Sequence, residues 1–118
     1  MSEDLSPFLP LSPATLHILL SLAGEERHGY GIMQEVARQS EGQYKLGPGT
    51  LYDNLQKMTE QGLVEEAARA SREEDSRRKY YRLTSFGRRV LVAEIARLET
   101  LVREAKANLR RPATGRAT

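Results

Sequence analysis

Apolar residues recur at alternating steps of four and three residues near the end of this 118-residue chain. The stripe consists of Leu91, Ile95, Leu98, Val102, Ala105 and Leu109. Such spacing is typical of a heptad seam along one face of an α-helix. A helix of about 25 residues is about 38 Å long, which is more than a small three-helix core can cover. The outer part of this helix therefore needs a second chain, and the stripe predicts a homodimer.

The overall composition is that of a single globular domain. Hydrophobic residues make up 39% and charged residues 29% of the sequence, which is typical of folded rather than disordered proteins. Because the sequence contains no cysteine, neither a disulfide framework nor a Cys-based metal site is expected. No apolar run approaches the roughly 18 residues of a membrane span, and "MSEDLSPF" lacks the basic start of a signal peptide. We expect a cytoplasmic protein without a membrane partner.

Capping signals and periodicity predict three helices before residue 63. Ser12, which precedes a proline, is typical of an N-cap, and Gly24 ends this first helix. A second helix follows "HGYG" and ends near Gly42. A third runs from "GPGT" to Gly62. Its predicted buried stripe consists of Leu51, Leu55 and Met58.

The segment Leu63–Leu83 predicts a β-hairpin around the polar loop "ASREEDSR". Alternation in "RKYYRL" places Tyr81 inward, with Tyr80 and Arg82 outward. Three helices, a hairpin and a long helix are the order of a winged helix-turn-helix protein. We expect a mainly α fold with a small β-hairpin. Its predicted parts are an N-terminal extension (residues 1–11), a winged helix-turn-helix DNA-binding domain (12–83), a C-terminal dimerisation helix (84–110) and a disordered tail (111–118).

The third helix is predicted to face DNA. Two glycines leave its first N–H groups uncovered, and a helix N-terminus of this kind favours a phosphate. Among the exposed side chains that follow, Asn and Gln can read adenine, Lys can read guanine, and Asp can accept a hydrogen bond from cytosine. The alternative is an ordinary exposed helix with a loose glycine start. The predicted DNA-binding residues are Gly47, Gly49, Thr50, Tyr52, Asp53, Asn54 and Lys57.

Asp53 is the ambiguous residue of this face, because an acid near phosphates weakens DNA binding by repulsion. Three alternative roles are open to it. It meets a base amino group, caps a local N–H or holds a neighbouring Arg, and the sequence leaves this choice open.

Two further segments are candidates for contact with the DNA backbone. In "RHGYG", His28 and the Tyr30 hydroxyl are predicted phosphate ligands; the alternative is a helix start with Tyr30 packed on the core. On the wing, Arg77, Arg78 and Lys79 are predicted to contact the backbone or the minor groove. The alternative here is a solvated hairpin in which the acids of "EED" pair with the same three cations.

Three stretches in register resemble the PadR family of transcriptional regulators: "HGYGIMQEV", "LGPGTLYDNLQKMTEQGLVEE" and "RRKYYRLTSFGRRVL". The resemblance covers about Leu11 to Leu109. It implies a winged-helix repressor that dimerises through its C-terminal helix, and the single helix is similar to the short-chain branch of the family. Two features depart from many relatives. Asp53 and Asn54 follow the Tyr where a Pro, Gly or Arg is common, and there is no Trp on which a ligand could stack.

We expect a homodimeric repressor that binds a palindromic operator in double-stranded DNA, with no cofactor and no metal. Catalysis has no support, because two histidines, no cysteine and no P-loop lysine in "GPGT" leave no catalytic arrangement. One alternative is a winged-helix dimer that serves as a protein-interaction module. Another, suggested by the family resemblance, is a sensor that holds a small-molecule effector in the dimer seam.

Overall fold

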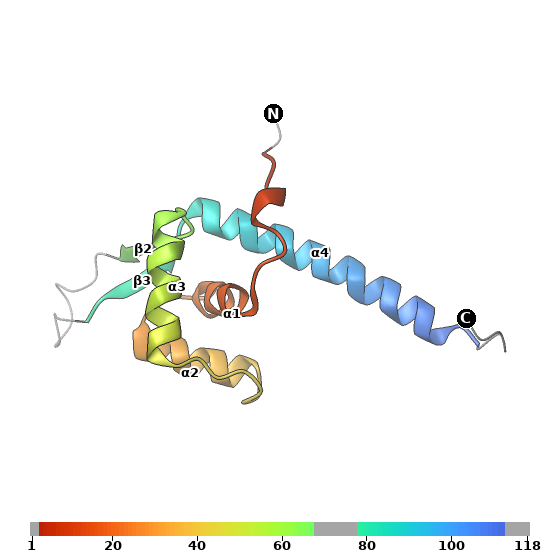
Figure 1. Cartoon of the computed structure of the whole chain (residues 1–118), viewed down its shortest axis with the longest axis horizontal. Helices are drawn as coiled ribbons and strands as arrows, with labels where there is room; N and C mark the ends of the chain where they lie inside the picture. The colour runs from red at the N-terminus through yellow and green to blue at the C-terminus, as the bar shows by residue number, and fades with distance from the viewer. Residues whose placement is uncertain (1–2, 68–77, 113–118) are drawn as a thin grey trace.

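The computed structural model describes residues 3–67 and 78–112, and its element order confirms the predicted fold class (Figure 1). Three helices precede the two longer strands of a small sheet, a long helix follows them, and the third, short strand lies between the first two helices. The elements are a 3₁₀ turn η1 (Ser6–Phe8), α1 (Pro13–Leu22), β1 (Arg27–His28), α2 (Gly29–Gln39), α3 (Pro48–Glu60), β2 (Val64–Ala67), β3 (Tyr80–Leu83) and α4 (Ser85–Arg110).

Side-chain caps fix the starts of three helices. The Ser12 hydroxyl accepts a hydrogen bond from the Thr15 N–H at the start of α1 (3.2 Å). The Thr84 hydroxyl accepts one from the Gly87 N–H at the start of α4 (2.9 Å). The start of α2 is capped by His28, a role that the sequence did not indicate. Each cap satisfies an amide that the helix itself leaves without a partner.

The sheet has three antiparallel strands in the order β1-β3-β2, so the predicted hairpin is only part of it. β1 pairs Arg27 with Tyr81 and His28 with Tyr80. A strand of two residues is too short to show alternation, which is why it could not be predicted. Tyr80, predicted to point outward, is only 8% exposed, and the His28 ring meets its ring edge-on at 5.2 Å.

The core lies where α1, α2 and α3 meet the sheet and the first turns of α4. Its most deeply buried side chains are Ile18, Leu19, Ile32, Val36, Leu51, Leu55, Met58, Leu63, Val64 and Val90. The predicted stripe of α3 is among them. This packing holds α3 by one side and leaves its other side exposed.

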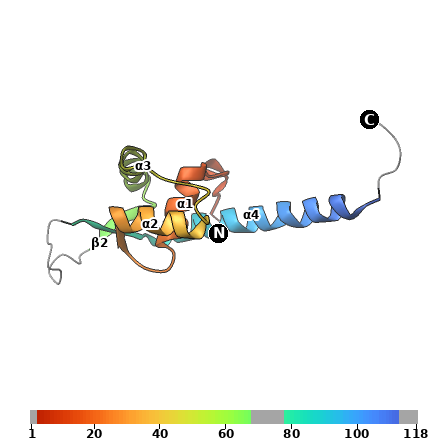
Figure 2. The same cartoon turned by 90° about the horizontal axis from the view of Figure 1, so that it is seen from below.

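α4 has a packed half and an exposed half. Its first turns bury Val90 and Leu91, whereas every residue from Leu101 to Arg110 is exposed. In both views the far half of the helix extends away from the rest of the domain (Figures 1 and 2). Leu91 was predicted to belong to the dimer stripe, but it is 4% exposed because it packs in the core of its own chain.

The segment before α1 packs on α4 through apolar contacts and one buried carboxylate. The Phe8 and Phe86 rings meet edge-on at 5.2 Å. Glu94, 1% exposed, accepts hydrogen bonds from the Leu11 N–H (3.0 Å) and from the Arg97 guanidinium (2.6 and 2.9 Å). The Arg97 bond is the main reason that the pKa of Glu94 lies below its ordinary value; burial opposes this lowering and the Leu11 bond adds to it.

Gly87 is required by the close approach of α4 to the end of α3. A Cβ at this position would overlap the backbone carbonyl of Leu63, which cannot move aside. We predict that Gly87→Ala destabilises the protein by about 1–3 kcal/mol, measured by urea unfolding followed by circular dichroism. Gly24→Ala is the matched control, because no atom lies within 4 Å of its added methyl group. Equal stability of the two variants would contradict this role of Gly87.

Candidate nucleic-acid interface

The start of α3 presents its first amides without a covering side chain. Gly47 is the N-cap residue in an extended conformation, and within the described structure no side chain caps the helix. A Cβ at Gly47 or at Gly49 would have no atom within 4 Å, so both glycines border open space. Thr50 is exposed beside them. The arrangement can bind an anion that approaches from outside the molecule.

The outer face of α3 carries the polar residues that the periodicity predicted. Tyr52, Asp53, Gln56 and Lys57 are exposed. Asn54 is half-buried at the edge of this face. Its Nδ2 donates to the Thr50 carbonyl (2.8 Å), and its Oδ1 lies 3.5 Å from the Thr15 hydroxyl. Asn54 therefore bonds within the protein, and its predicted contact with DNA stays a prediction.

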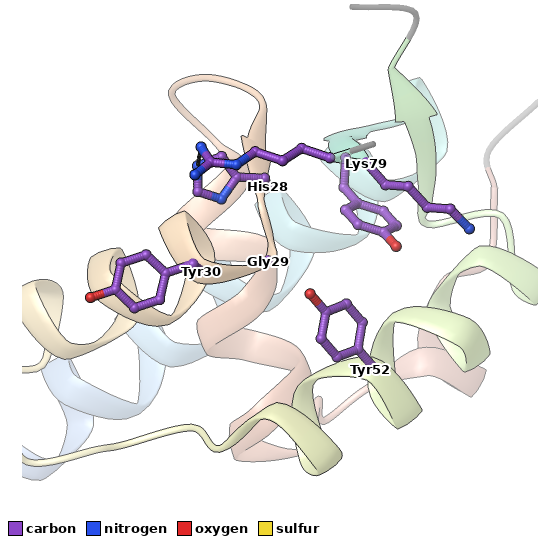
Figure 3. A pocket seen from close by; sticks show the side chains of 7 residues that line it. His28, Gly29, Tyr30, Tyr52 and Lys79 are labelled. Carbon is purple, nitrogen blue, oxygen red and sulfur yellow. Dashed lines mark hydrogen bonds between the residues drawn. The ribbon is translucent and has the colours of Figure 1, made fainter. Parts of the chain in front are cut away.

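A pocket of about 380 Å³ lies between the start of α2, the middle of α3 and the start of β3 (Figure 3). Tyr52 extends from α3 so that its phenol oxygen lies against Gly29, where a Cβ would overlap it. Tyr30 is 63% exposed, so the alternative that it packs on the core is wrong. The lining residues are His28, Gly29, Tyr30, Tyr52, Arg78, Lys79 and Tyr81.

The structure thus brings together five predicted residues from β1, α2, α3 and the segment just before β3: His28, Tyr30, Tyr52, Arg78 and Lys79. Gly29 and Tyr81 complete the pocket and were not among the predicted site residues. The sequence did contain a signal for Gly29. It directly follows His28, and a residue without a Cβ permits the close approach of another side chain. Burial is the main reason that the pKa of Tyr81 is raised, with Glu66 and Tyr52 adding to it, so this phenol keeps its proton at neutral pH.

His28 and Arg78 place two hydrogen-bond donors side by side. The Gly31 N–H donates to His28 Nδ1 (3.1 Å), and the ring proton of the neutral imidazole is therefore on Nε2. Arg78 Nη1 lies 3.1 Å from that same Nε2. Both groups carry N–H bonds. An acceptor placed beside them, such as a phosphate oxygen, can bond to both.

Arg82 and Lys79 are engaged by acids on β2. Arg82 Nε lies 2.8 Å from Glu65, and Lys79 Nζ lies 3.8 Å from Glu66. Lys79 thus has an acid partner on β2. Arg77 and the acids of "EED" lie outside the described residues.

The outer half of α4 exposes most of the predicted dimer stripe. Ile95 is 36%, Val102 51% and Leu109 85% exposed. Ala105 is exposed as well, and Leu98 is half-buried. Ile95, Leu98 and Val102 line a shallow apolar surface, which is flanked by Glu99, Arg103 and Lys106.

Residues 3–67 and 78–112 hold neither a cluster of metal-binding side chains nor a membrane-spanning helix. This part of the chain contains no group of three or more His, Asp or Glu residues that could hold a metal ion. None of its helices is both long enough and apolar enough to cross a membrane.

Residues 18–93 match the transcriptional regulator PadR-like family. The chain is 39% identical over 90 residues to the transcriptional regulator Rv3488 of Mycobacterium tuberculosis, covering 75% of this chain and 78% of that protein. A PadR-like transcriptional regulator from Bacillus cereus is similar in structure (TM-score 0.70, 22% identity, 94% of this chain and 100% of that chain). A PadR family transcription regulator from Clostridium difficile also has a TM-score of 0.70, at 22% identity over 83% and 99% of the two chains. These two structures share the fold.

The tautomer of His28 can be measured directly. We predict that neutral His28 carries its proton on Nε2, because Nδ1 accepts the Gly31 N–H. Long-range ¹H–¹⁵N correlation spectra distinguish the two tautomers, and a His17→Gln variant assigns the signals, since the chain has two histidines. A proton on Nδ1 would contradict the donor pair described here.

Proposed function

This chain belongs to the PadR-like family of transcriptional regulators, and we propose that it represses transcription by binding a palindromic operator as a homodimer. In this proposal residues 12–83 bind DNA and residues 84–110 form the dimer. The observation that carries it is the open start of α3, whose uncovered amides lie beside an exposed polar face of the same helix.

The pocket and the start of α3 are the proposed phosphate sites. One backbone phosphate accepts hydrogen bonds from His28 Nε2 and Arg78, with Tyr30, Tyr52 and Lys79 around it. A second phosphate lies against the amides at Gly47 and Gly49 and against the Thr50 hydroxyl. Both sites border the face of α3 that carries Asp53, Gln56 and Lys57, which we propose enters the major groove.

Dimerisation is proposed to occur along the exposed half of α4. Without Leu91, the stripe consists of Ile95, Leu98, Val102, Ala105 and Leu109. Burying one large aliphatic side chain contributes about 1.5–3 kcal/mol, and four such residues from each chain oppose an association cost of about 4–15 kcal/mol. Two-fold symmetry of such a dimer presents two α3 helices to two half-sites.

A small-molecule effector is a second candidate function, favoured by the shallow apolar surface at Ile95, Leu98 and Val102. A flat apolar ligand bound there would alter how the two α4 helices pack. This change would move the two DNA-binding domains relative to each other and release the operator.

The salt dependence of DNA binding tests the main proposal. With about four phosphate contacts per protomer, log K falls against log salt concentration with a slope of about −7 for the dimer.

Arg78→Ala is expected to weaken binding to all sequences alike and to reduce the slope by about 1 per protomer. Lys57→Ala is expected instead to relax base preference. Arg88→Ala, on α4, is the matched control. A slope near zero favours the protein-interaction alternative and contradicts the proposal.

The dimer is tested by placing a charge on the stripe. Val102→Asp is expected to shift the protein toward monomer, because the carboxylate would be desolvated at the interface. Thr100→Asp is the control, since this residue lies on another face of the same exposed half. Sedimentation equilibrium measures both. Two variants of the same mass as the unmodified protein would contradict the proposed interface.

A further inference from the structure

Asp53 lies at the centre of the exposed face of α3. It stands two residues after Leu51 and two before Leu55, both of which are buried. At about 100° per residue this spacing places Asp53 nearly opposite the buried stripe. The carboxylate is therefore as far from the core as any position on this helix.

The carboxylate of Asp53 makes no hydrogen bond and no ion pair with any described residue. Two of its three alternative roles are thereby removed, because it neither caps the start of α3 nor holds an arginine. Other acids of this region are engaged. Glu65 contacts Arg82 (2.8 Å), and Glu60 accepts from Gln56 (3.5 Å). The remaining role of Asp53 is contact with a base.

Major-groove chemistry narrows which base a carboxylate can contact. A carboxylate only accepts hydrogen bonds, so the acceptor edges of guanine (O6, N7) and thymine (O4) repel it. Adenine offers an amino group but places the N7 acceptor beside it. Cytosine presents its N4 amino group with no acceptor next to it on its own edge.

We propose that Asp53 selects a cytosine, through its N4 amino group, at one position of each operator half-site. This inference rests on the proposed DNA-binding function and adds a specificity-determining residue to it. Lys57 lies one turn further along the same face, about 6 Å away along the helix axis, and is exposed. Its ammonium group donates to the O6 and N7 acceptors of a nearby guanine.

Selection of bound DNA from a random pool tests this assignment with three variants. The unmodified protein is expected to retain one invariant cytosine in each half-site. Asp53→Asn is expected to shift that position toward adenine, because an amide can bond to both N6 and N7. Asp53→Ala is expected to lose the preference at this position alone. Glu60→Gln is the matched control: it removes one negative charge from the same helix two turns away and keeps the cytosine.

Affinity measurements on the selected site complete the test. Replacing the cytosine by thymine is expected to weaken binding by the unmodified protein about 10- to 100-fold, and binding by Asp53→Ala less than about twofold. If Asp53→Ala keeps its preference for cytosine, or if it merely raises affinity for all sequences as Glu60→Gln does, the assignment is overturned. If the unmodified protein binds DNA without sequence preference, this inference is overturned together with the proposed operator. If it binds no DNA at all, the proposed function fails as well.

Discussion

The carbonyl oxygen of Leu63 fixes four elements of this protein at one point. It accepts a hydrogen bond from the Thr84 N–H (3.1 Å), and it lies directly under Gly87. The Thr84 hydroxyl in turn lies within hydrogen-bonding distance of the carbonyls of Gly62 and Leu63 and caps α4. The end of α3, the start of β2, the end of β3 and the start of α4 thus meet at a single set of backbone bonds. Because these bonds are short and the glycine admits no side chain, the orientation of α3 relative to α4 has little freedom.

Some of the positive charge among the described residues is paired with acids within the fold. Net charge is only +2, and several arginines are held by acids within the fold. Arg38 bonds to Glu35 at 2.7 and 2.9 Å, which is the main reason that the pKa of Glu35 falls to about 2. Arg82 is held by Glu65. Among the described residues, these pairs thus engage part of the positive charge within the fold.

Local patterns were sufficient to predict the helices and the fold class. The apolar period of α3, the cap at Ser12 and the heptad stripe of α4 each express a local rule that the tertiary structure obeys. The features that could not be predicted depend on contacts between distant segments. Pairing of β1 with β3 buries Tyr80, Thr15 lies beside Asn54, and the protein core takes up Leu91. None of these partners is within reach along the sequence.

In the candidate site, too, some features follow from local sequence patterns and others depend on contacts between distant segments. Exposure of Tyr52, Asp53 and Lys57 follows from helical periodicity alone. The contact between Tyr52 and Gly29 does not, since it requires α2 and α3 to cross at a particular separation. Likewise, the sequence identified His28 and Arg78 separately, but only the folded sheet brings their nitrogens to 3.1 Å.

Because α4 has a packed half and an exposed half, two quantities are linked: the position at which two chains pair and the distance between their DNA-binding domains. In the proposed dimer, the position along α4 at which two chains pair also determines how far apart the two α3 helices lie. A shift of pairing by one heptad moves the partner by about 10 Å along the helix, which corresponds to about three base pairs of DNA. Lengthening or shortening α4 by one heptad would therefore alter operator spacing without changing any residue that touches DNA.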